Sequence, residues 1–279
     1  MLGLTSMLAM SESDGLSSFT LLKLYFPIFL VAFVVAVLIT PIIRWAAREA
    51  GIVDHPDEAR KLHKKPVAYL GGFVILFATL VGIGLSYTDV VAQPTFMRQV
   101  PYVIVLGMIA IAFTGFIDDV WGSYSWHKTA GQLIAAAAMA HQGIGTTVAT
   151  GILNGIGVPK SISEFVFVDA STFLIDPITP AYIIGVLIIA MFILGACNAA
   201  NLIDGLDGLL SGVVAITAIG LLVITLFALD ALTPEKIANI ESTLPVDALG
   251  MRGLDGVTLL GTNIVLSLAV LGAVLGFLI

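Results

Sequence analysis

Asp118 and Asp119 are adjacent carboxylates that close an apolar run beginning near residue 101. An acid near the centre of a membrane helix costs about 2.5–3.5 kcal/mol, less at the interface, and neighbouring like charges repel unless a cation intervenes. The nearest basic residue along the chain is Lys128, nine positions after Asp119. We therefore expect an unneutralised pair that binds a divalent cation, and Mg²⁺ prefers carboxylate oxygens together with substrate phosphates. Two solvated aspartates at a helix end are the alternative.

A second polar segment places Asn198, Asn201, Asp204 and Asp207 at strict three-residue spacing. On one continuous helix each step of three turns the side chain by about 300°, so the first and last of these residues would face opposite sides. The glycines that follow Asp204 and Asp207 permit a break or a positive φ. The segment therefore predicts a helix end and turn that presents both carboxylates to one pocket. A plain polar turn between two spans is the alternative.

A third segment, residues 54–66, is basic, contains Lys61 and His63, and leads to the pair Gly71-Gly72. Its prolines and the glycine pair predict an irregular backbone. One interpretation is a juxtamembrane loop that sets topology and touches anionic lipid headgroups. The glycine pair favours a binding loop instead.

The composition assigns these segments to a membrane protein. Of 279 residues, 58% are hydrophobic and 11% charged, with a mean hydropathy of +1.06. A soluble domain carries about a quarter charged residues, so soluble enzymes and secreted scaffolds are excluded. The net charge of −7 argues against a nucleic-acid partner, which clustered Lys and Arg would hold. The single cysteine, Cys197, cannot form an internal disulfide.

The apolar runs predict an all-α, polytopic membrane helix bundle of about seven transmembrane helices. Measured against the roughly 20 residues that cross a bilayer, the candidate spans lie near 21–43, 68–87, 101–117, 130–149, 181–199, 209–229 and 257–279. The fourth is the weakest, because Gln132, His141 and several glycines dilute it. We expect a poorly ordered leader over residues 1–20 and a single transmembrane domain over 21–279.

The basic residues predict the orientation, because cytoplasmic loops retain Lys and Arg. The loop 44–66 carries Arg44, Arg48, Arg60, Lys61, Lys64 and Lys65, so it is expected in the cytoplasm. Alternation then places the loops 118–129 and 199–208 there too, with the amino terminus outside and Ile279 inside. All three polar segments would share the cytoplasmic face.

The three segments, in this order, resemble the polyprenyl-phosphate N-acetylhexosamine-1-phosphate transferases of glycosyltransferase family 4. The matching residues run from Asp54 through Arg60-Lys61-Leu62-His63 to Pro66 and Gly71-Gly72, from Gly115 to Asp119 with Lys128 and Gln132 behind, and from Asn198 to Asp207-Gly208-Leu209. The resemblance covers about residues 21–279, and it supports the fourth span.

The resemblance implies a bacterial inner-membrane enzyme with a cytoplasmic active site. Such enzymes transfer a sugar 1-phosphate from a UDP-N-acetylhexosamine to polyprenyl phosphate, here undecaprenyl phosphate, for cell-envelope polysaccharides such as lipopolysaccharide or teichoic acid, and release UMP. The expected donor is UDP-GlcNAc and the expected cofactor is Mg²⁺, which Mn²⁺ could replace. The membrane itself is a partner, and a homodimer is compatible with the resemblance.

The resemblance also assigns roles to residues. The catalytic set is Asp118, Asp119, Asp204 and Asp207; the metal set is Asp118, Asp119 and Asp207; the substrate-binding set is Lys61, His63, Gly71, Gly72, Lys128, Asn198 and Asn201. A phosphomonoester has a second pKa of about 6, so the acceptor is already mostly ionised at neutral pH. Positioning and charge shielding are therefore favoured over base catalysis, with a covalent aspartyl intermediate as the competing mechanism.

Two other functions stay open: the phospho-N-acetylmuramoyl-pentapeptide transferase branch, and an ion-coupled membrane transporter whose acids bind ions. The family also carries a Phe-Met-Gly-Asp-type motif and a His- and Arg-rich loop that do not occur in this chain. From the resemblance we expect a C-terminally incomplete chain without transferase activity on its own. A naturally short, non-catalytic relative is the alternative.

Overall fold

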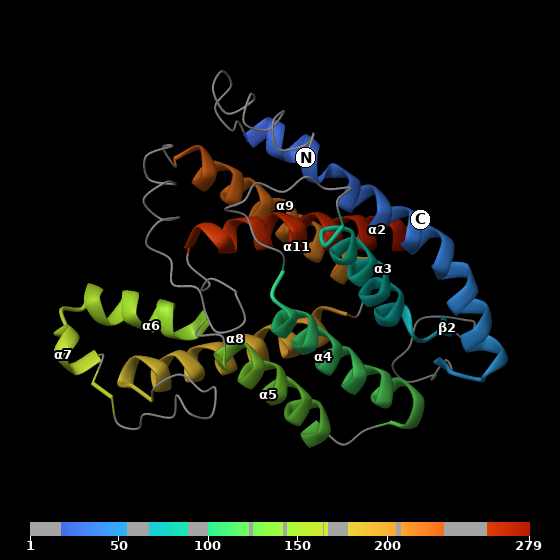
Figure 1. The fold of residues 1–279 in the computed structure, drawn as a ribbon. Helices are drawn as coiled ribbons and strands as arrows, with labels where there is room; N and C mark the ends of the chain where they lie inside the picture. The colour runs from blue at the N-terminus through green and yellow to red at the C-terminus, as the bar shows by residue number, and fades with distance from the viewer. Residues whose placement is uncertain are drawn as a thin grey trace. The chain divides into compact units, whose positions relative to one another are not determined.

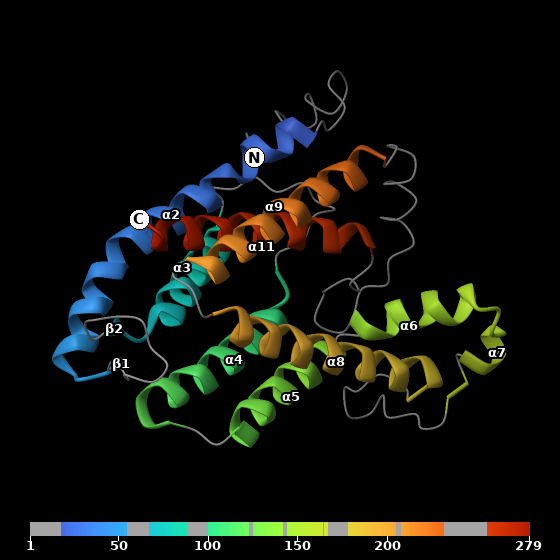
Figure 2. The same cartoon turned by 180° about the vertical axis from the view of Figure 1, so that it is seen from behind.

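The residues that the structure describes fold almost entirely into α-helices, seen from two sides in the computed structural model (Figures 1 and 2). The structure describes residues 18–54, 67–88, 100–122, 125–141, 144–163, 165–166, 178–204, 208–231 and 256–279. The helices are α2 (Ser18–Glu49), α3 (Gly71–Leu85), α4 (Tyr102–Trp121), α5 (Ser125–His141), α6 (Ile144–Gly155), α7 (Lys160–Ser163), α8 (Pro180–Ile203), α9 (Leu209–Asp230) and α11 (Gly256–Phe277). The all-α membrane helix bundle expected from the sequence is confirmed.

Five helices in the described part of the chain are long and apolar enough to cross a membrane: α2, α4, α8, α9 and α11. The apolar helix α3 is shorter, at 15 residues. The expected fourth span, near 130–149, divides between α5 and α6, which have 17 and 12 residues. The polar and glycine-rich sequence that made this span the weakest fits the division, because glycine costs about 1 kcal/mol inside a helix. A multi-pass membrane protein is supported, but the described residues do not confirm the count of seven spans.

The described residues belong to two compact units. Unit 1 comprises residues 1–38, 77–100 and 211–279, and unit 2 comprises 39–76 and 101–210. Residues 1–17 of the expected leader lie outside the described part, and the expected single domain over 21–279 stays a prediction. Every candidate site residue falls in unit 2, so the site can be built from that unit alone.

In unit 1, α11 packs closely on α2 through two glycines one turn apart. A Cβ atom added at Gly272 or Gly276 would collide with the carbonyl oxygens of Phe29 and Phe33. Small residues at this spacing let two membrane helices approach backbone to backbone. About 61% of the apolar stretch of α11 is buried, so this helix forms the core of unit 1.

In unit 2, α5 contacts α4 and α8, and α6 packs on α8. The α6–α8 contact is a crossing of backbones: a Cβ atom at Gly185 would lie 2.5 Å from the backbone nitrogen of Thr146 and from the carbonyl carbon of Gly145. The α4–α5 contact is as close, between Gly131 and the side chain of Thr114. Glycine is therefore required at both crossings.

All three tryptophans of the chain lie in unit 2 near helix ends. Trp45, Trp121 and Trp126 are 65%, 71% and 66% exposed. Exposed tryptophan near the end of an apolar helix is typical of the interface between lipid and water. At the end of α4, the carboxylates of Asp118 and Asp119 therefore lie close to Trp121, a residue typical of the membrane interface.

Candidate active site

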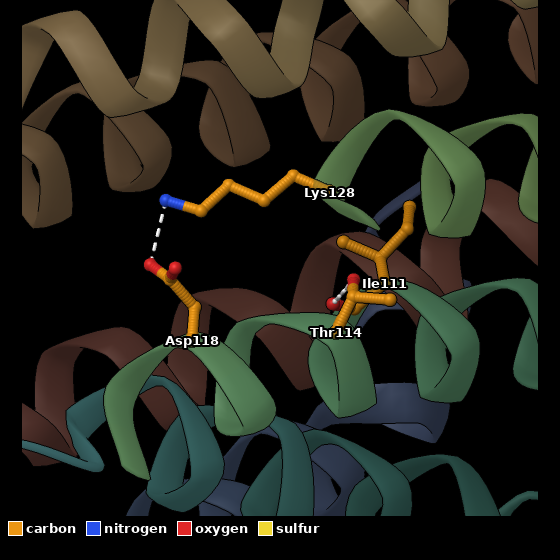
Figure 3. Close-up of polar contacts among 4 residues, drawn as sticks. All are labelled: Ile111, Thr114, Asp118 and Lys128. Atoms are coloured by element: carbon orange, nitrogen blue, oxygen red, sulfur yellow. Dashed lines mark hydrogen bonds and ion pairs between the residues drawn. The ribbon is translucent and has the colours of Figure 1, made fainter. Parts of the chain in front are cut away.

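The carboxylate of Asp118 forms an ion pair with Lys128. The Lys128 Nζ lies 2.6 Å from the Asp118 Oδ2, and both side chains are partly exposed (Figure 3). The chain reverses between them: α4 ends at Trp121, Gly122 follows with φ 65°, and α5 begins at Ser125. The expectation that no base balances Asp118 is wrong, because ten residues of separation become one contact when two helices form a hairpin.

Asp119 lies half-buried at the same end of α4. Its carboxylate accepts a hydrogen bond from the backbone N–H of Leu70, and it interacts electrostatically with Asp118, Lys128 and Asp204. These partners come from the start of α3, from α4 and α5, and from the end of α8. The structure thus brings the ends of α4 and α8, the start of α5 and the backbone directly before Gly71-Gly72 together around one carboxylate.

Leu70, which the sequence analysis missed, is the donor to Asp119. Its φ is 72°, and it is the one non-glycine residue with a positive φ in the described ranges. A left-handed conformation costs an L-residue about 1–2 kcal/mol, and such strain gathers at functional sites. No sequence signal marks it, because a bulky side chain is rare at positive φ.

A chain of backbone hydrogen bonds holds Leu70 in place. Ile52 N–H donates to the Ala47 carbonyl in α2, and Tyr69 N–H donates to the Ile52 carbonyl. The strands β1 (Val53–Asp54) and β2 (Val67–Ala68) pair antiparallel beside this connection. Lys61 and His63 belong to residues 55–66 between the strands and lie outside the described residues.

Gly71 and Gly72 open α3 directly after Leu70, which places them beside Asp119. The first N–H groups of a helix have no partner within it and attract anions. A Cβ atom at Gly72 would meet nothing within 4 Å. Packing in the described residues therefore does not require glycine there, which fits a surface that a ligand approaches.

The second polar segment, which begins at Asn198, forms the end of α8, as expected. Asn198 donates from its Nδ2 to the Leu194 carbonyl at 2.8 Å, and Asn201 lies on the last turn. Asp204 follows as the C-cap, with its N–H bonded to the Ala200 carbonyl. Asp207 lies outside the described residues, so its predicted roles stay a prediction.

The charges of the cluster favour a bound cation. Asp118, Asp119 and Asp204 lie at the C-terminal ends of α4 and α8, the ends where the helix dipole disfavours negative charge. Among the described residues around Asp119, three carboxylates face the ammonium of Lys128, which leaves an excess of two negative charges. Within this part of the chain, the pairing of Asp118 alone does not neutralise the site.

The donor set fits Mg²⁺ in the way that proteins commonly hold it. Within the described ranges, no three His, Cys, Asp or Glu side chains gather closely enough to enclose a metal. Mg²⁺ rarely needs such a cage, because one or two carboxylates, waters and substrate phosphates complete its octahedron. Asp119, with Asp118 or Asp204 near it, would supply the carboxylate oxygens.

Gln132 lies one helical turn after Lys128 on α5 and is 9% exposed. Its Oε1 is buried and has no hydrogen-bond partner among the described residues. Buried polar atoms are nearly always paired, by protein, water or ligand. An unused acceptor thus lies beside the ion pair, although the sequence analysis assigned Gln132 no role of its own.

Comparison with known proteins gives one family and a set of related enzymes. The family model of glycosyl transferase family 4 matches residues 101–279. The chain is 28% identical over 196 residues to the decaprenyl-phosphate N-acetylglucosaminephosphotransferase of Mycolicibacterium smegmatis, covering 70% of this chain and 43% of that protein. It is 30% identical over 205 residues to the probable undecaprenyl-phosphate N-acetylglucosaminyl 1-phosphate transferase of Bacillus subtilis, covering 72% and 48%.

A related enzyme with a different substrate name also matches. The phospho-N-acetylmuramoyl-pentapeptide-transferase of Corynebacterium kroppenstedtii is 30% identical over 200 residues, covering 67% of this chain and 54% of that protein. The chain spans about half the length of the curated relatives it matches.

Proposed function

The chain belongs to glycosyl transferase family 4, and on that premise we propose that it transfers N-acetylhexosamine 1-phosphate from a UDP-sugar to a polyprenyl phosphate. The proposed donor is UDP-GlcNAc and the proposed acceptor undecaprenyl phosphate. The observation that carries the proposal is the cluster around Asp119, in which the Leu70 N–H before α3, the C-terminal ends of α4 and α8, and Lys128 of α5 meet. The names of the relatives support the class of reaction.

The reaction needs alignment and charge shielding more than proton transfer. An oxygen of the acceptor phosphate attacks the sugar-linked phosphorus of the donor, the bond from that phosphorus to the bridging oxygen breaks, and UMP leaves with the electron pair. Mg²⁺, when bound, would supply positive charge that offsets the negative charge on the phosphate oxygens during the transfer. Asp119 would orient it, and the first N–H groups of α3 would face the phosphates.

Lys128 would take part by exchanging partners. In the structure its ammonium is held by Asp118 at 2.6 Å. A lysine acts on phosphate as a mobile point charge on a flexible stem, so it can leave the carboxylate for an incoming phosphate oxygen. The carboxylate of Asp118 would then be free to bind the cation, as the sequence analysis expected.

The direct test uses membranes that carry the protein expressed from its native gene, supplied with undecaprenyl phosphate, Mg²⁺ and either labelled UDP-GlcNAc or UDP-N-acetylmuramoyl-pentapeptide. The expected result is UMP together with a labelled lipid diphosphate sugar from UDP-GlcNAc. Product from the pentapeptide donor alone would move the chain to the other branch. Solute uptake into vesicles without cleavage of the UDP-sugar would indicate a transporter instead of an enzyme.

Sidedness gives a further prediction, because we place the active site on the cytoplasmic face of the inner membrane. Within these 279 residues, only Cys197 must be replaced to obtain a cysteine-free background. Single cysteines at Thr129 and at Leu202, which is 84% exposed, should react with an impermeant maleimide from the cytoplasm only. A cysteine at Ile156, 71% exposed after α6, should react from outside only. Labelling of Thr129→Cys and Ile156→Cys from the same side would contradict the proposed crossing between them.

A further inference from the structure

The contact between Thr114 and Gly131 lies on the same seam of α4 and α5 as the Asp118–Lys128 pair. Thr114 precedes Asp118 by one helical turn, and Gly131 follows Lys128 by three residues. Residues so spaced share one face of a helix. Figure 3 shows Thr114 and Asp118 on α4 with Lys128 reaching across from α5. The two contacts are therefore neighbouring levels of one helix pair.

The seam is closed to any side chain at position 131. A Cβ atom there would lie 2.8 Å from the Thr114 Oγ1 and 3.0 Å from the Thr114 Cβ, and closer still to its Cγ2. Rotation of Thr114 about χ1 would disturb the hydrogen bond that its Oγ1 donates to the Ile111 carbonyl at 2.7 Å (Figure 3), and it would leave the Thr114 Cβ where it is, 3.0 Å from the added atom. A larger residue at 131 would have to move the helices.

We propose that Thr114 and Gly131 are a positioning pair: their contact fixes the separation and rotation of α5 on α4, and thereby places Lys128 at Asp118. Packed helices shift as rigid bodies, so a displacement at Gly131 reaches Lys128 almost undiminished. Neither residue touches the charges, and both act through Lys128. The consequence for turnover rests on the proposed function, whereas the consequence for the ion pair does not.

The test compares Gly131→Ala with the double variant Thr114→Gly/Gly131→Ala, which removes the atoms that the new methyl group would meet. Gly151→Ala on α6 is the matched control, because a Cβ atom at Gly151 meets nothing within 4 Å. An intermediate double variant, Thr114→Ala/Gly131→Ala, keeps the Thr114 Cβ position and should be restored only in part.

The first readout needs no substrate. Acylation of Lys128 is followed by mass spectrometry with exposed Lys160 on α7 as the internal reference. A side chain held against a carboxylate is less available to the acylating reagent than one that is released, so the ion pair slows acylation. Gly131→Ala should speed acylation of Lys128 several-fold relative to Lys160, Asp118→Asn should give the upper limit, and the Thr114→Gly double variant should return it to the wild-type rate.

The second readout is the transfer reaction. A misplacement of about 1 Å can cost about 10²-fold in rate, so Gly131→Ala should lower kcat by that order with KM little changed, and the double variant should recover it. General loosening of the fold would instead lower the amount of folded enzyme without rescue. If the acylation pattern appears but wild-type protein expressed from its native gene makes no UMP, the proposed function fails and the positioning pair stands. Unchanged acylation in Gly131→Ala, or fast acylation in a folded double variant, overturns the positioning pair.

Discussion

Asp119→Asn should lower the rate of sugar-phosphate transfer by about 10²-fold or more, the scale of losing one preorganised charge contact in an active site. Asp119 is the carboxylate on which the electrostatic contacts of α4, α5 and α8 and the Leu70 N–H converge. The amide keeps the shape but removes the charge that would hold the cation. The Mg²⁺ concentration for half-maximal rate should therefore rise as kcat falls, measured by Mg²⁺ titration of UMP release.

The control for this substitution is Glu49→Gln, which neutralises an exposed carboxylate at the end of α2 in the same unit. It should leave both the rate and the Mg²⁺ dependence unchanged. Near wild-type activity in Asp119→Asn would mean that Asp119 only stabilises the start of α3, through its hydrogen bond with Leu70, and takes no part in the reaction.

Gly185→Ala should destabilise the protein by about 2–3 kcal/mol, and Gly185→Leu should prevent folding. The new side chain would collide with backbone atoms, which cannot move aside as a flexible side chain could. The added Cβ would lie 2.5 Å from backbone atoms of Gly145 and Thr146. For a domain of this size about 2–4 °C is lost per kcal/mol. Thermal unfolding in detergent should therefore show a fall in Tm of roughly 5–10 °C for the alanine variant.

Gly195→Ala is the matched control on the same helix, because a Cβ atom there meets nothing within 4 Å. It should leave Tm unchanged or raise it slightly, since alanine is the better helix former by up to about 1 kcal/mol. Equal loss of Tm in both variants would mean that glycine matters for α8 as a whole rather than at the crossing with α6.

The parts of the fold that follow from local sequence could be predicted. Apolar runs of sufficient length gave α4, α8, α9 and α11, because in lipid a helix is the one way for a single segment to satisfy its backbone. The end of α8 at Asp204 followed from the glycines after it. The expected span near 130–149 did not appear as one helix, because its pattern is polar and rich in glycine, and packing against α8 decides its shape.

The contacts of the site depend on tertiary geometry, and the sequence showed only some of them. Asp118 and Lys128 looked remote because they were compared along the chain. They are nevertheless equally distant in sequence from residue 123, which lies between the end of α4 and the start of α5, and so are Thr114 and Gly131 to within one residue. Reading the two helices as a hairpin would have found both pairs. The positive φ of Leu70 had no such signal, since only surrounding contacts can impose it.

The placement of Trp45, Trp121 and Trp126 determines what optical spectroscopy can observe in this protein. All three indole rings belong to unit 2, and unit 1 contains none. Intrinsic tryptophan emission is therefore a reporter of the half that holds the acidic cluster, and it is blind to the packing of α11 on α2. A melting curve recorded by emission and one recorded by helix content should separate whenever the two units unfold at different temperatures.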